Sequence, residues 1–323
     1  MACIMARVHE RWLDGSARPS DEEGGALRAL VARLVGPGFG IERALGGMTT
    51  PVYRLQRDGE DLYLRMAEGP GGSMHAEAAV HEDLRAAGVS VPEVIAVDDG
   101  PEIGRGVMLV RAIGGEPATG ADGIDLAPIL RAAGRDLATI NSLAVDGFGW
   151  IRREEPVWPP RGEDATYEAF VNGGTGAVAA LADRLPTDEA RGVLEARLGE
   201  ARADDPPSRL AHGDFDVTHI FQRDCRYTGV IDLGEMRGAE PHYDLAYFLV
   251  HDQAGTMLGD LIAGYAEVVV LSGDLATRLR RSATVIVATQ LSRWIVRDGL
   301  ECVERPSVRW WLARLSTLLD DGT

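Results

Sequence analysis

The 323-residue sequence contains no lysine, and all 33 of its basic side chains are arginine. A Walker A loop needs a lysine at the phosphates of its nucleotide, and enzymes that carry a cofactor as a Schiff base need a lysine amine. The sequence therefore excludes both classes. Cysteine is scarce as well, because Cys3, Cys225 and Cys302 are scattered and odd in number. Neither a disulfide framework nor a zinc site is indicated.

Positive charge is also in short supply, since 50 acidic residues against 33 arginines give a net charge of −17. Such a chain repels phosphate backbones, so we expect no nucleic-acid partner. The acidity suits a cationic ligand, although solubility alone also accounts for it. The start of the chain has no apolar signal core, and the best apolar stretch, residues 283 to 296, is interrupted by Gln290 and Arg293. We therefore expect a cytoplasmic protein with no membrane partner.

Hydrophobic periodicity divides the sequence into a strand-rich beginning and a helical remainder. Helical spacing follows Ser20 and Ser73, which predicts helices at residues 21 to 35 and from 73 to 88. Strand patterns occur at residues 41 to 45, 52 to 57, 62 to 66, 94 to 97 and 107 to 110. Further helices are predicted at residues 125 to 143, 166 to 170, 177 to 185, 245 to 250, 258 to 270, 276 to 296 and 308 to 319. Residues 147 to 160 read as a loop.

The residues with catalytic chemistry concentrate between positions 211 and 246. His212-Gly213-Asp214 precedes two apolar runs, and the polar residues 222 to 226 between these runs predict a hairpin. The hairpin brings Asp214 and His219 close to Asp232, where the second run ends. Phosphoryl transfer needs such a combination, because Mg²⁺ bridges phosphate oxygens while a separate carboxylate accepts the hydroxyl proton.

The order of these parts resembles the aminoglycoside phosphotransferase family of the protein-kinase-like fold. That family has His-Gly-Asp, four residues, Asn, then Ile-Asp at a strand end, then Asp-Leu-Ala. The matching residues are His212-Gly213-Asp214, His219, Ile231-Asp232 and Asp244-Leu245-Ala246. The resemblance implies a bilobal α+β fold. Its nucleotide-binding lobe, residues 1 to 110, has a five-stranded antiparallel sheet and one main helix. A hinge at residues 111 to 115 leads to a larger helical lobe, residues 116 to 323, with the catalytic loop and the acceptor site.

Carried over position by position, the resemblance makes Asp214 the catalytic base and Asp232 the main Mg²⁺ ligand. Asp244 becomes a buried brace under the loop, and His212 becomes a structural support. His219 departs from the family, which has an amide oxygen for the second metal ion at this place. An imidazole can ligate directly, act through water or contact phosphate as a cation, and it suits zinc or manganese better than Mg²⁺.

The resemblance also implies a nucleotide site, for ATP or GTP, made of ten residues. They are Gly46, Gly47, Thr49 and Thr50 of a phosphate-covering turn, Arg65 with its partner Glu77, and Met108, Arg111, Ile113 and Ile231 around the base. Glu82 is the reserve partner of Arg65. A guanidinium can hold phosphate oxygens in place of the lysine of kinase-like enzymes. Each position also has a plainer reading as a hairpin turn, a solvated arginine or strand core.

Five acidic residues are candidates for binding amino groups of the acceptor, although charged residues in a polar loop are usually only solvated. They are Glu235, Glu168, Asp164, Glu301 and Glu304. Gly213 replaces the arginine of protein kinases, which favours a small-molecule kinase over a regulated protein kinase. We expect γ-phosphate transfer to a hydroxyl of a small cationic molecule, an aminoglycoside or a related basic antibiotic, by a monomer or dimer. The alternatives are a metabolic kinase for a sugar, amino alcohol or nucleoside analogue, and a nucleotide-binding protein without transfer activity.

Overall fold

The computed structural model describes residues 21–44, 51–119, 125–154, 156–185 and 187–320. Its contacts divide the chain into two compact units. The first comprises the residues up to 86 together with 91–113 and 153–156, and the second comprises 87–90, 114–152 and the residues from 157 onward. Within the described ranges, no helix has both the length and the apolar content that crossing a lipid bilayer requires.

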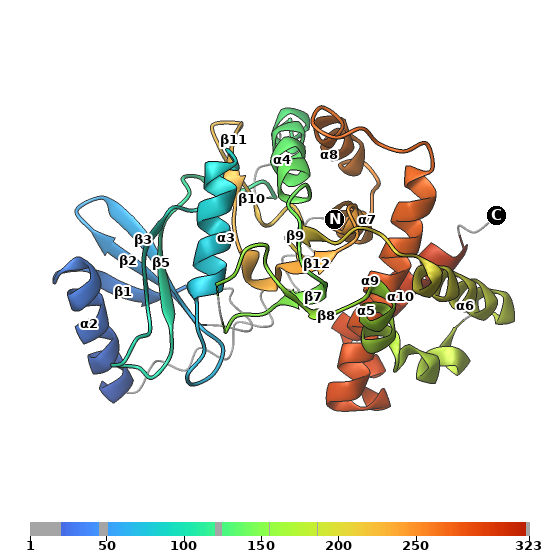
Figure 1. The fold of residues 1–323 in the computed structure, drawn as a ribbon, viewed down its shortest axis with the longest axis horizontal. Helices are drawn as coiled ribbons and strands as arrows, with labels where there is room; N and C mark the ends of the chain where they lie inside the picture. Colours follow the sequence, from blue (N-terminus) through green and yellow to red (C-terminus); the bar gives the residue numbers. More distant parts are fainter. Residues whose placement is uncertain (1–20, 45–50, 120–124, 155, 186, 321–323) are drawn as a thin grey trace. The chain divides into compact units, whose positions relative to one another are not determined.

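The first unit is built on a five-stranded antiparallel sheet (Figure 1). Its strands are β1 (Gly40–Arg43), β2 (Val52–Arg57), β3 (Glu60–Met66), β4 (Val94–Asp98) and β5 (Val107–Arg111), in the order β1-β2-β3-β5-β4. Asp58 and Gly59 connect β2 to β3, and both have positive φ angles, of 48° and 84°. Two positive φ angles are what a type I′ hairpin turn requires, so this turn follows from the Asp-Gly pair.

Two helices, α2 (Asp21–Val35) and α3 (His75–Ala86), cover opposite faces of this sheet (Figure 1). Leu30 of α2 packs with Leu62 and Leu64 of β3, whereas Ala78 of α3 packs with Met108 of β5. Successive side chains of a strand point to opposite faces, which is why one strand can serve two apolar layers. Burying each of these leucines contributes about 1.5–3 kcal/mol.

The second unit is mainly helical. Its helices are α4 (Ala127–Ile140), α5 (Tyr167–Thr175), α6 (Asp188–Ala203), α7 (Tyr243–His251), α8 (Leu258–Tyr265), α9 (Leu275–Asp298) and α10 (Pro306–Asp320). The long helix α9 packs against α5, α6, α7 and α10. Helices α4 and α8 approach closely at Gly134 and Gly264, where an added Cβ would lie 2.2 and 1.9 Å from a carbonyl oxygen of the other helix. These two glycines therefore set the α4–α8 distance.

Two small sheets support the segment that carries the predicted catalytic residues. One has the order β8-β7-β12-β9 and consists of β7 (Phe148–Ile151), β8 (Gly162–Asp164), β9 (Arg209–Ala211) and β12 (Arg237–Ala239). The other has the order β11-β10-β6 and consists of β6 (Glu116–Pro117), β10 (Ile220–Arg223) and β11 (Arg226–Val230). The antiparallel pairing of β10 with β11 confirms the hairpin predicted after His212-Gly213-Asp214.

The sequence prediction was wrong for three segments. Residues 147 to 160 are not all loop, because β7 lies there. Residues 177 to 185 form a 3₁₀ helix, η2 (Val178–Arg184), instead of an α-helix. Helix α6 was not predicted, because its buried stripe consists of two alanines and two leucines, which gives a weak periodic signal. The side chain of Thr187 caps α6 by accepting a hydrogen bond from the Ala190 N–H at 3.0 Å.

Glu240 lies between β12 and α7, and burial raises its pKa to about 7. The Ser282 hydroxyl and Arg281 offset burial only in part. In the unfolded chain the carboxyl has its ordinary pKa of 4.5. The unfolded chain thus loses the proton between pH 4.5 and 7 while the folded chain keeps it, so this residue lowers stability as the pH rises through that window and has no further effect above it.

We expect Glu240→Gln to remove this pH dependence. The difference in unfolding free energy between the variant and the parent should change by on the order of 3 kcal/mol between pH 4.5 and 8, in favour of the variant at the higher pH. Urea unfolding at both pH values measures the change. Glu200→Gln, at an exposed position of α6, is the matched control. Its unfolding free energy should change with pH as that of the parent does. If Glu240→Gln and the parent differed in unfolding free energy by the same amount at both pH values, the pKa of Glu240 would not be the cause of the pH dependence.

Candidate active site

The loop between β9 and β10 is held by Asp244, in the first turn of α7. This carboxylate is fully buried and accepts hydrogen bonds from the backbone N–H groups of His212, at 2.8 Å, and Gly213, at 2.9 Å. It also accepts from Nδ2 of Asn141 at 2.8 Å. Three donors fix both the carboxylate and the loop backbone, because hydrogen bonds to a charged group are the strong ones. Asp244 therefore braces the backbone of the loop at His212 and Gly213.

His212 ties the same loop to the end of the hairpin. Its Nε2 donates to the carbonyl oxygen of Ile231 at 2.8 Å, and its Nδ1 accepts from the Asp214 N–H at 3.4 Å. Burial lowers the pKa of His212, and the neighbouring His219 lowers it further. A neutral imidazole has one donor and one acceptor nitrogen, which matches both contacts. His212 therefore acts within the loop as a structural residue.

Gly213 occupies a place where no side chain fits. Its φ angle is 88°, and an added Cβ would lie 1.9 Å from the Glu235 carbonyl oxygen. The neighbouring space is filled by the guanidinium of Arg237, which is almost fully buried and donates to the Glu235 carboxylate at 2.7 Å and to the Tyr243 hydroxyl at 3.2 Å. Protein kinases have an arginine at the position of Gly213. In this chain, Arg237 of β12 fills the space beside that position instead. Sequence reasoning missed Arg237.

Asp214 is the carboxylate at the centre of the loop. The Tyr247 hydroxyl donates a short hydrogen bond to its Oδ1. Burial raises the pKa of Asp214, and the charge of His219 and the Tyr247 hydrogen bond offset part of this increase. A carboxylate with a raised pKa accepts a proton more readily than an exposed one. Tyr247 was not predicted, although it lies one residue beyond the Asp-Leu-Ala motif on α7.

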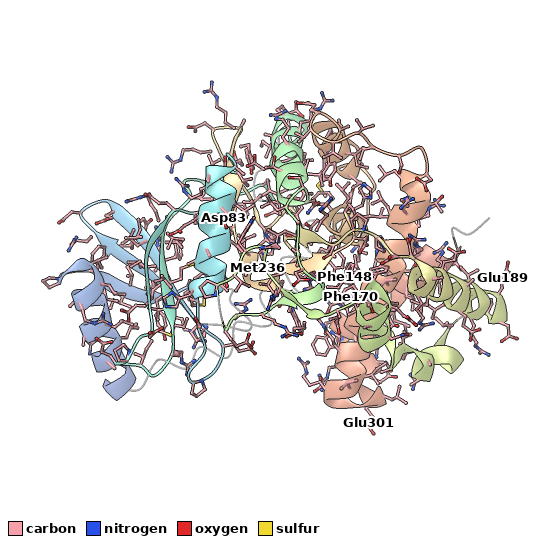
Figure 2. All side chains as sticks on the ribbon, viewed as in Figure 1. Asp83, Phe148, Phe170, Glu189, Met236 and Glu301 are labelled. Carbon is pink, nitrogen blue, oxygen red and sulfur yellow. The ribbon has the colours of Figure 1, made fainter. Side chains whose placement is uncertain are left out.

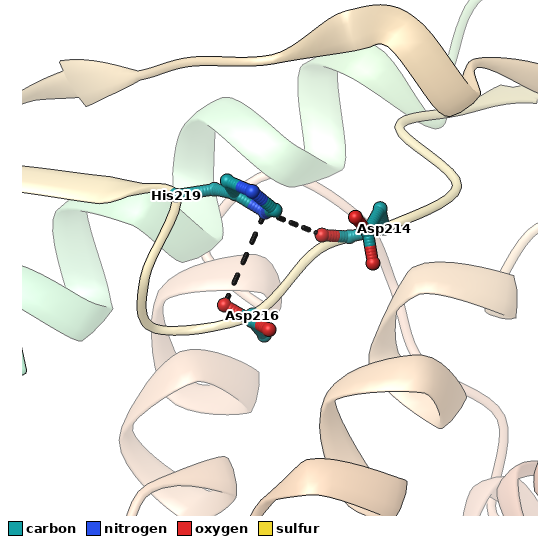
Figure 3. Close-up of side chains that lie close together, drawn as sticks. All are labelled: Asp214, Asp216 and His219. Atoms are coloured by element: carbon teal, nitrogen blue, oxygen red, sulfur yellow. Dashed lines mark hydrogen bonds and ion pairs between the residues drawn. The ribbon is translucent and has the colours of Figure 1, made fainter. Parts of the chain in front are cut away.

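His219 lies among three carboxylates, of which Figure 3 shows two. Its Nδ1 donates to the Asp214 carbonyl oxygen at 2.7 Å and lies 3.9 Å from Oδ1 of Asp216, while its Nε2 lies 4.0 Å from Oδ2 of Asp232. Burial lowers the pKa of His219, but Asp216, Asp214 and Asp232 outweigh burial and leave the pKa raised. The loop thus brings the predicted residues 214, 219 and 232 together.

Asp216 is a further member of this group that the sequence prediction missed. It accepts hydrogen bonds from the backbone N–H of Thr218, at 2.7 Å, and from the Thr218 hydroxyl at 2.5 Å. Burial raises its pKa, but the charges of His219 and His251 and the Thr218 hydrogen bonds reverse this and leave the pKa lowered. The signal was present in the sequence, because an aspartate side chain commonly accepts a hydrogen bond from the backbone N–H two residues further on.

In the first unit, Arg65 of β3 and Glu77 of α3 form the expected ion pair. Nη1 of Arg65 lies 3.0 Å from Oε1 of Glu77, whose side chain is completely buried. Nη1 of Arg153 donates to the other oxygen, Oε2, at 2.8 Å. One buried carboxylate therefore orients two guanidinium groups, the second from a segment more than 70 residues further along the chain. The reserve candidate, Glu82, is exposed on the same helix.

A family model described as the phosphotransferase enzyme family matches residues 40–279, about three quarters of the chain. The chain belongs to this family. It is therefore a phosphotransferase that acts on hydroxyl groups of small molecules, as the sequence predicted. No curated protein matches the sequence at a significant level.

Solved structures of other phosphotransferases share the fold. A thermostable mutant of aminoglycoside phosphotransferase APH(4)-Ia, crystallised with AMP-PNP and hygromycin B, has a TM-score of 0.68 at 16% identity and covers 92% of this chain and 99% of its own. The macrolide 2′-phosphotransferase MphH of Brachybacterium faecium has a TM-score of 0.58 at 18% identity. The match covers 92% of this chain and 99% of MphH. A protein assigned as a fructosamine-3-kinase from Haemophilus somnus has a TM-score of 0.58 at 14% identity. The match covers 92% of this chain and 96% of that protein. The predicted α+β, protein-kinase-like fold is confirmed.

The second unit of this phosphotransferase offers a donor set that fits a divalent cation. Because the Asp214 carbonyl oxygen only accepts, Nδ1 of His219 carries a proton, and the lone pair of the neutral ring lies on Nε2, which faces Oδ2 of Asp232. Asp214, Asp216 and His219 also each offer one ligand atom within 4.8 Å of the others. Asp232 has a left-handed backbone, with φ at 67°, and its Oδ1 accepts from the Gly234 N–H at 3.3 Å.

The other predicted nucleotide residues of the phosphotransferase are spread over both units. Met108 is fully buried in the apolar layer under α3. The backbone N–H of Arg111 donates to the Glu93 carbonyl oxygen at 2.8 Å, and its side chain pairs with the Glu93 carboxylate. Ile113 is partly exposed at the end of the first unit, and the carbonyl of Ile231 in the second unit accepts from His212. Gly46, Gly47, Thr49 and Thr50 lie outside the described residues.

The five predicted acceptor residues of the phosphotransferase are not brought together. Glu235 is engaged by Arg237, by Nε1 of Trp150 at 3.1 Å, and by the Arg293 guanidinium at 3.9 Å. Glu304 pairs with Arg184 and Arg309, Glu168 is exposed, and burial raises the pKa of Asp164. In Figure 2, Glu301 lies well apart from Met236, the neighbour of Glu235.

We expect Glu77→Gln to destabilise the protein by about 2 kcal/mol, because two guanidinium groups lose the charge that holds them. The same change should weaken nucleotide binding, since the orientation of Arg65 depends on the carboxylate. Urea unfolding and nucleotide titration measure the two effects. Glu82→Gln removes an exposed charge from the same helix and is the matched control, with an expected change within about 0.5 kcal/mol. Equal behaviour of the two variants would show that the buried pair does not matter.

Proposed function

We propose that this phosphotransferase transfers the γ-phosphate of ATP to a hydroxyl group of a small cationic molecule, an aminoglycoside or a related basic antibiotic. The observation that carries the proposal is the convergence of Asp214, His219 and Asp232 at one loop. This arrangement provides both a proton acceptor and cation ligands, as phosphoryl transfer requires. The activity would give resistance by O-phosphorylation.

Asp214 has the role of general base in this proposal. Tyr247 takes Oδ1, which leaves Oδ2 to accept the proton of the acceptor hydroxyl. The hydroxyl oxygen then forms a bond to the γ-phosphorus, and the bond from that phosphorus to the β-γ bridging oxygen breaks, so that ADP leaves. Asp244 and His212 keep the loop in the conformation that this step needs. A positioned base of this kind contributes about 10²–10⁴-fold to the rate.

Two groups of residues meet the charge of the triphosphate in this proposal. Asp232 and His219 would hold Mg²⁺, which supplies neutralisation of the phosphate charge when bound. Arg65, oriented by Glu77, would grip the α and β phosphates, because a guanidinium can bind two phosphate oxygens at once. The AMP-PNP bound to the similar enzyme APH(4)-Ia supports a nucleoside triphosphate as the donor.

The charge of the chain supports the proposed acceptor class. The net charge of −17 favours a cationic small molecule over an anionic one. Hygromycin B in the similar structure supports an aminoglycoside. A metabolic kinase for an amino sugar is the second candidate, because the chain also has the fold of a protein assigned as a fructosamine-3-kinase.

A panel assay tests the proposal. Purified protein with MgATP is incubated with hygromycin B, other aminoglycosides, basic peptide antibiotics, a macrolide and a fructosamine, and mass spectrometry detects an added phosphate. We expect transfer to a basic antibiotic. Phosphorylation of the fructosamine alone would select the metabolic kinase. Stabilisation by MgATP without transfer to any of these acceptors would contradict the proposal.

A further inference from the structure

An array of four aromatic rings extends from the catalytic loop across α7 to α10. Tyr247 and His251 are four residues apart on α7, and their rings stack at 4.6 Å with an interplanar angle of 24°. The His251 ring stacks on Trp310 of α10 at 5.3 Å and 30°, and it meets the edge of Trp311 at 5.5 Å. Trp310 and Trp311 meet edge to face at 4.8 Å.

The array starts at the carboxylate that is proposed to act as the base. Tyr247 is buried, and its hydroxyl donates a hydrogen bond to Asp214. His251 donates from Nδ1 to the Tyr247 carbonyl oxygen at 3.0 Å, and its charge acts on Asp216. Two ring contacts, of 4.6 and 5.3 Å between centroids, therefore connect Trp310 to the tyrosine that bonds Asp214.

Trp310 is not needed by the apolar core of α10. The buried residues of α10 are Val308, Leu315, Leu318 and Leu319. Helical periodicity places Trp310 off this stripe, whereas Trp311 lies on it. His251, Trp310 and Trp311 each retain partial exposure, unlike Tyr247. Partly exposed tryptophan rings suit ligand contact, because they combine apolar area with a negative ring face.

The alternative side of the loop is less suited to a cation. There, the Glu235 carboxylate already faces Arg237 and Arg293, and the Arg293 guanidinium lies 4.2 Å above the Trp150 ring. A cationic acceptor would have to displace an internal guanidinium to reach either group. Next to His251, in contrast, the carboxylates of Asp214 and Asp216 lie beside the Tyr247 and His251 rings, where they can attract a cation.

We infer that Trp310, Trp311 and His251 form the wall against which the acceptor lies during phosphorylation. The acceptor is a hydroxylated ring that bears a protonated amine: its C–H face packs on the tryptophans, the ammonium group lies over a ring face, and the reacting hydroxyl points to Asp214. This inference rests on the proposed function and adds the residues that select the acceptor. Cation–π attraction to tryptophan is the strongest of its kind among the side chains.

The experiment compares Trp310→Ala and Trp310→Phe with the parent and with Trp294→Ala. Trp294 is a partly exposed tryptophan of α9 that lies beneath Arg297, so it controls for the loss of an indole elsewhere. The readouts are KM for hygromycin B, or for the best acceptor of the panel, KM for ATP, and the melting temperature. For Trp310→Ala we expect KM for the acceptor to rise about tenfold, the size of a desolvated cation–π contact, with KM for ATP unchanged.

Trp310→Phe retains a ring face and should recover most of the acceptor affinity, which a purely structural role would not produce. Trp294→Ala should resemble the parent. An acceptor KM that is unchanged in Trp310→Ala, or raised equally with KM for ATP, would overturn the aromatic wall while leaving the phosphotransferase reaction intact. A parent protein that binds MgATP and phosphorylates no member of the panel would instead overturn the proposed function together with this inference.

Discussion

Asp214→Asn is expected to lower kcat by about 10³-fold or more while leaving the nucleotide Kd within about twofold. The amide is isosteric with the carboxylate and can still accept the Tyr247 hydrogen bond through its oxygen, but it cannot take the hydroxyl proton. Removing a general base costs about 10²–10⁴-fold, and the buried setting of Asp214 favours the upper part of that range. Coupled measurement of ADP release with the acceptor identified in the panel gives kcat.

The control for this variant is Asp205→Asn, which removes an exposed carboxylate of the same unit. It should keep the parent's kcat. If Asp214→Asn turned over at the parent's rate, the base would have to be sought elsewhere, with Asp216 as the nearest carboxylate on the same loop. Equal melting temperatures of the two variants would exclude loss of folding as the cause of a lower rate.

Asp244→Asn is expected to destabilise the protein by on the order of 3–4 kcal/mol and to abolish transfer. The carboxylate accepts three hydrogen bonds and donates none, from His212, Gly213 and Asn141. An asparagine in its place must direct its own NH₂ at one of these donors. Hydrogen bonds to a buried charged group contribute about 1.5–3 kcal/mol each, and one misplaced donor removes at least one of them. Urea unfolding and the transfer assay measure the two effects.

Asp252 supplies a matched control at the other end of α7. It is also buried, and it accepts from the backbone N–H groups of Thr256, Met257 and Leu258. Asp252→Asn should therefore lower stability by a similar amount but keep kcat, because its partners are not part of the catalytic loop. If both variants lost stability and both kept kcat, Asp244 would be a general folding residue instead of a brace for the loop.

The parts of the fold that could be predicted are those whose local chemistry decides the outcome. The Asp58-Gly59 turn, the strand at Val52–Arg57 and the hairpin around Asp224 follow from residues next to one another in the chain. Helix α6 could not be found in this way. Its packing against α5 and α9 decides which of its alanines are buried, and those contacts cannot be read from the sequence of α6 itself.

The candidate site shows the same division. That Asp214, His219 and Asp232 lie close together could be predicted, because their spacing in the sequence reflects one hairpin. Arg153 could not, since it reaches Glu77 across 76 positions in the sequence. Arg237 was equally hidden, because a buried arginine reads as a solvated charge until the space beside Gly213 is known. The predicted role of Glu235 as an acceptor residue depended on the same missing information, namely the two arginines that face it.

The left-handed backbone of Asp232 decides which substitutions can be interpreted at the predicted metal ligand. Side chains with a branched Cβ clash with their own carbonyl group at a φ angle of 67°, and most other non-glycine residues lose about 1–2 kcal/mol there. Asparagine tolerates the conformation because its short polar side chain can hydrogen-bond locally. An alanine or valine scan would therefore report a distorted loop, whereas the carboxamide keeps an oxygen in place and isolates the loss of the negative charge.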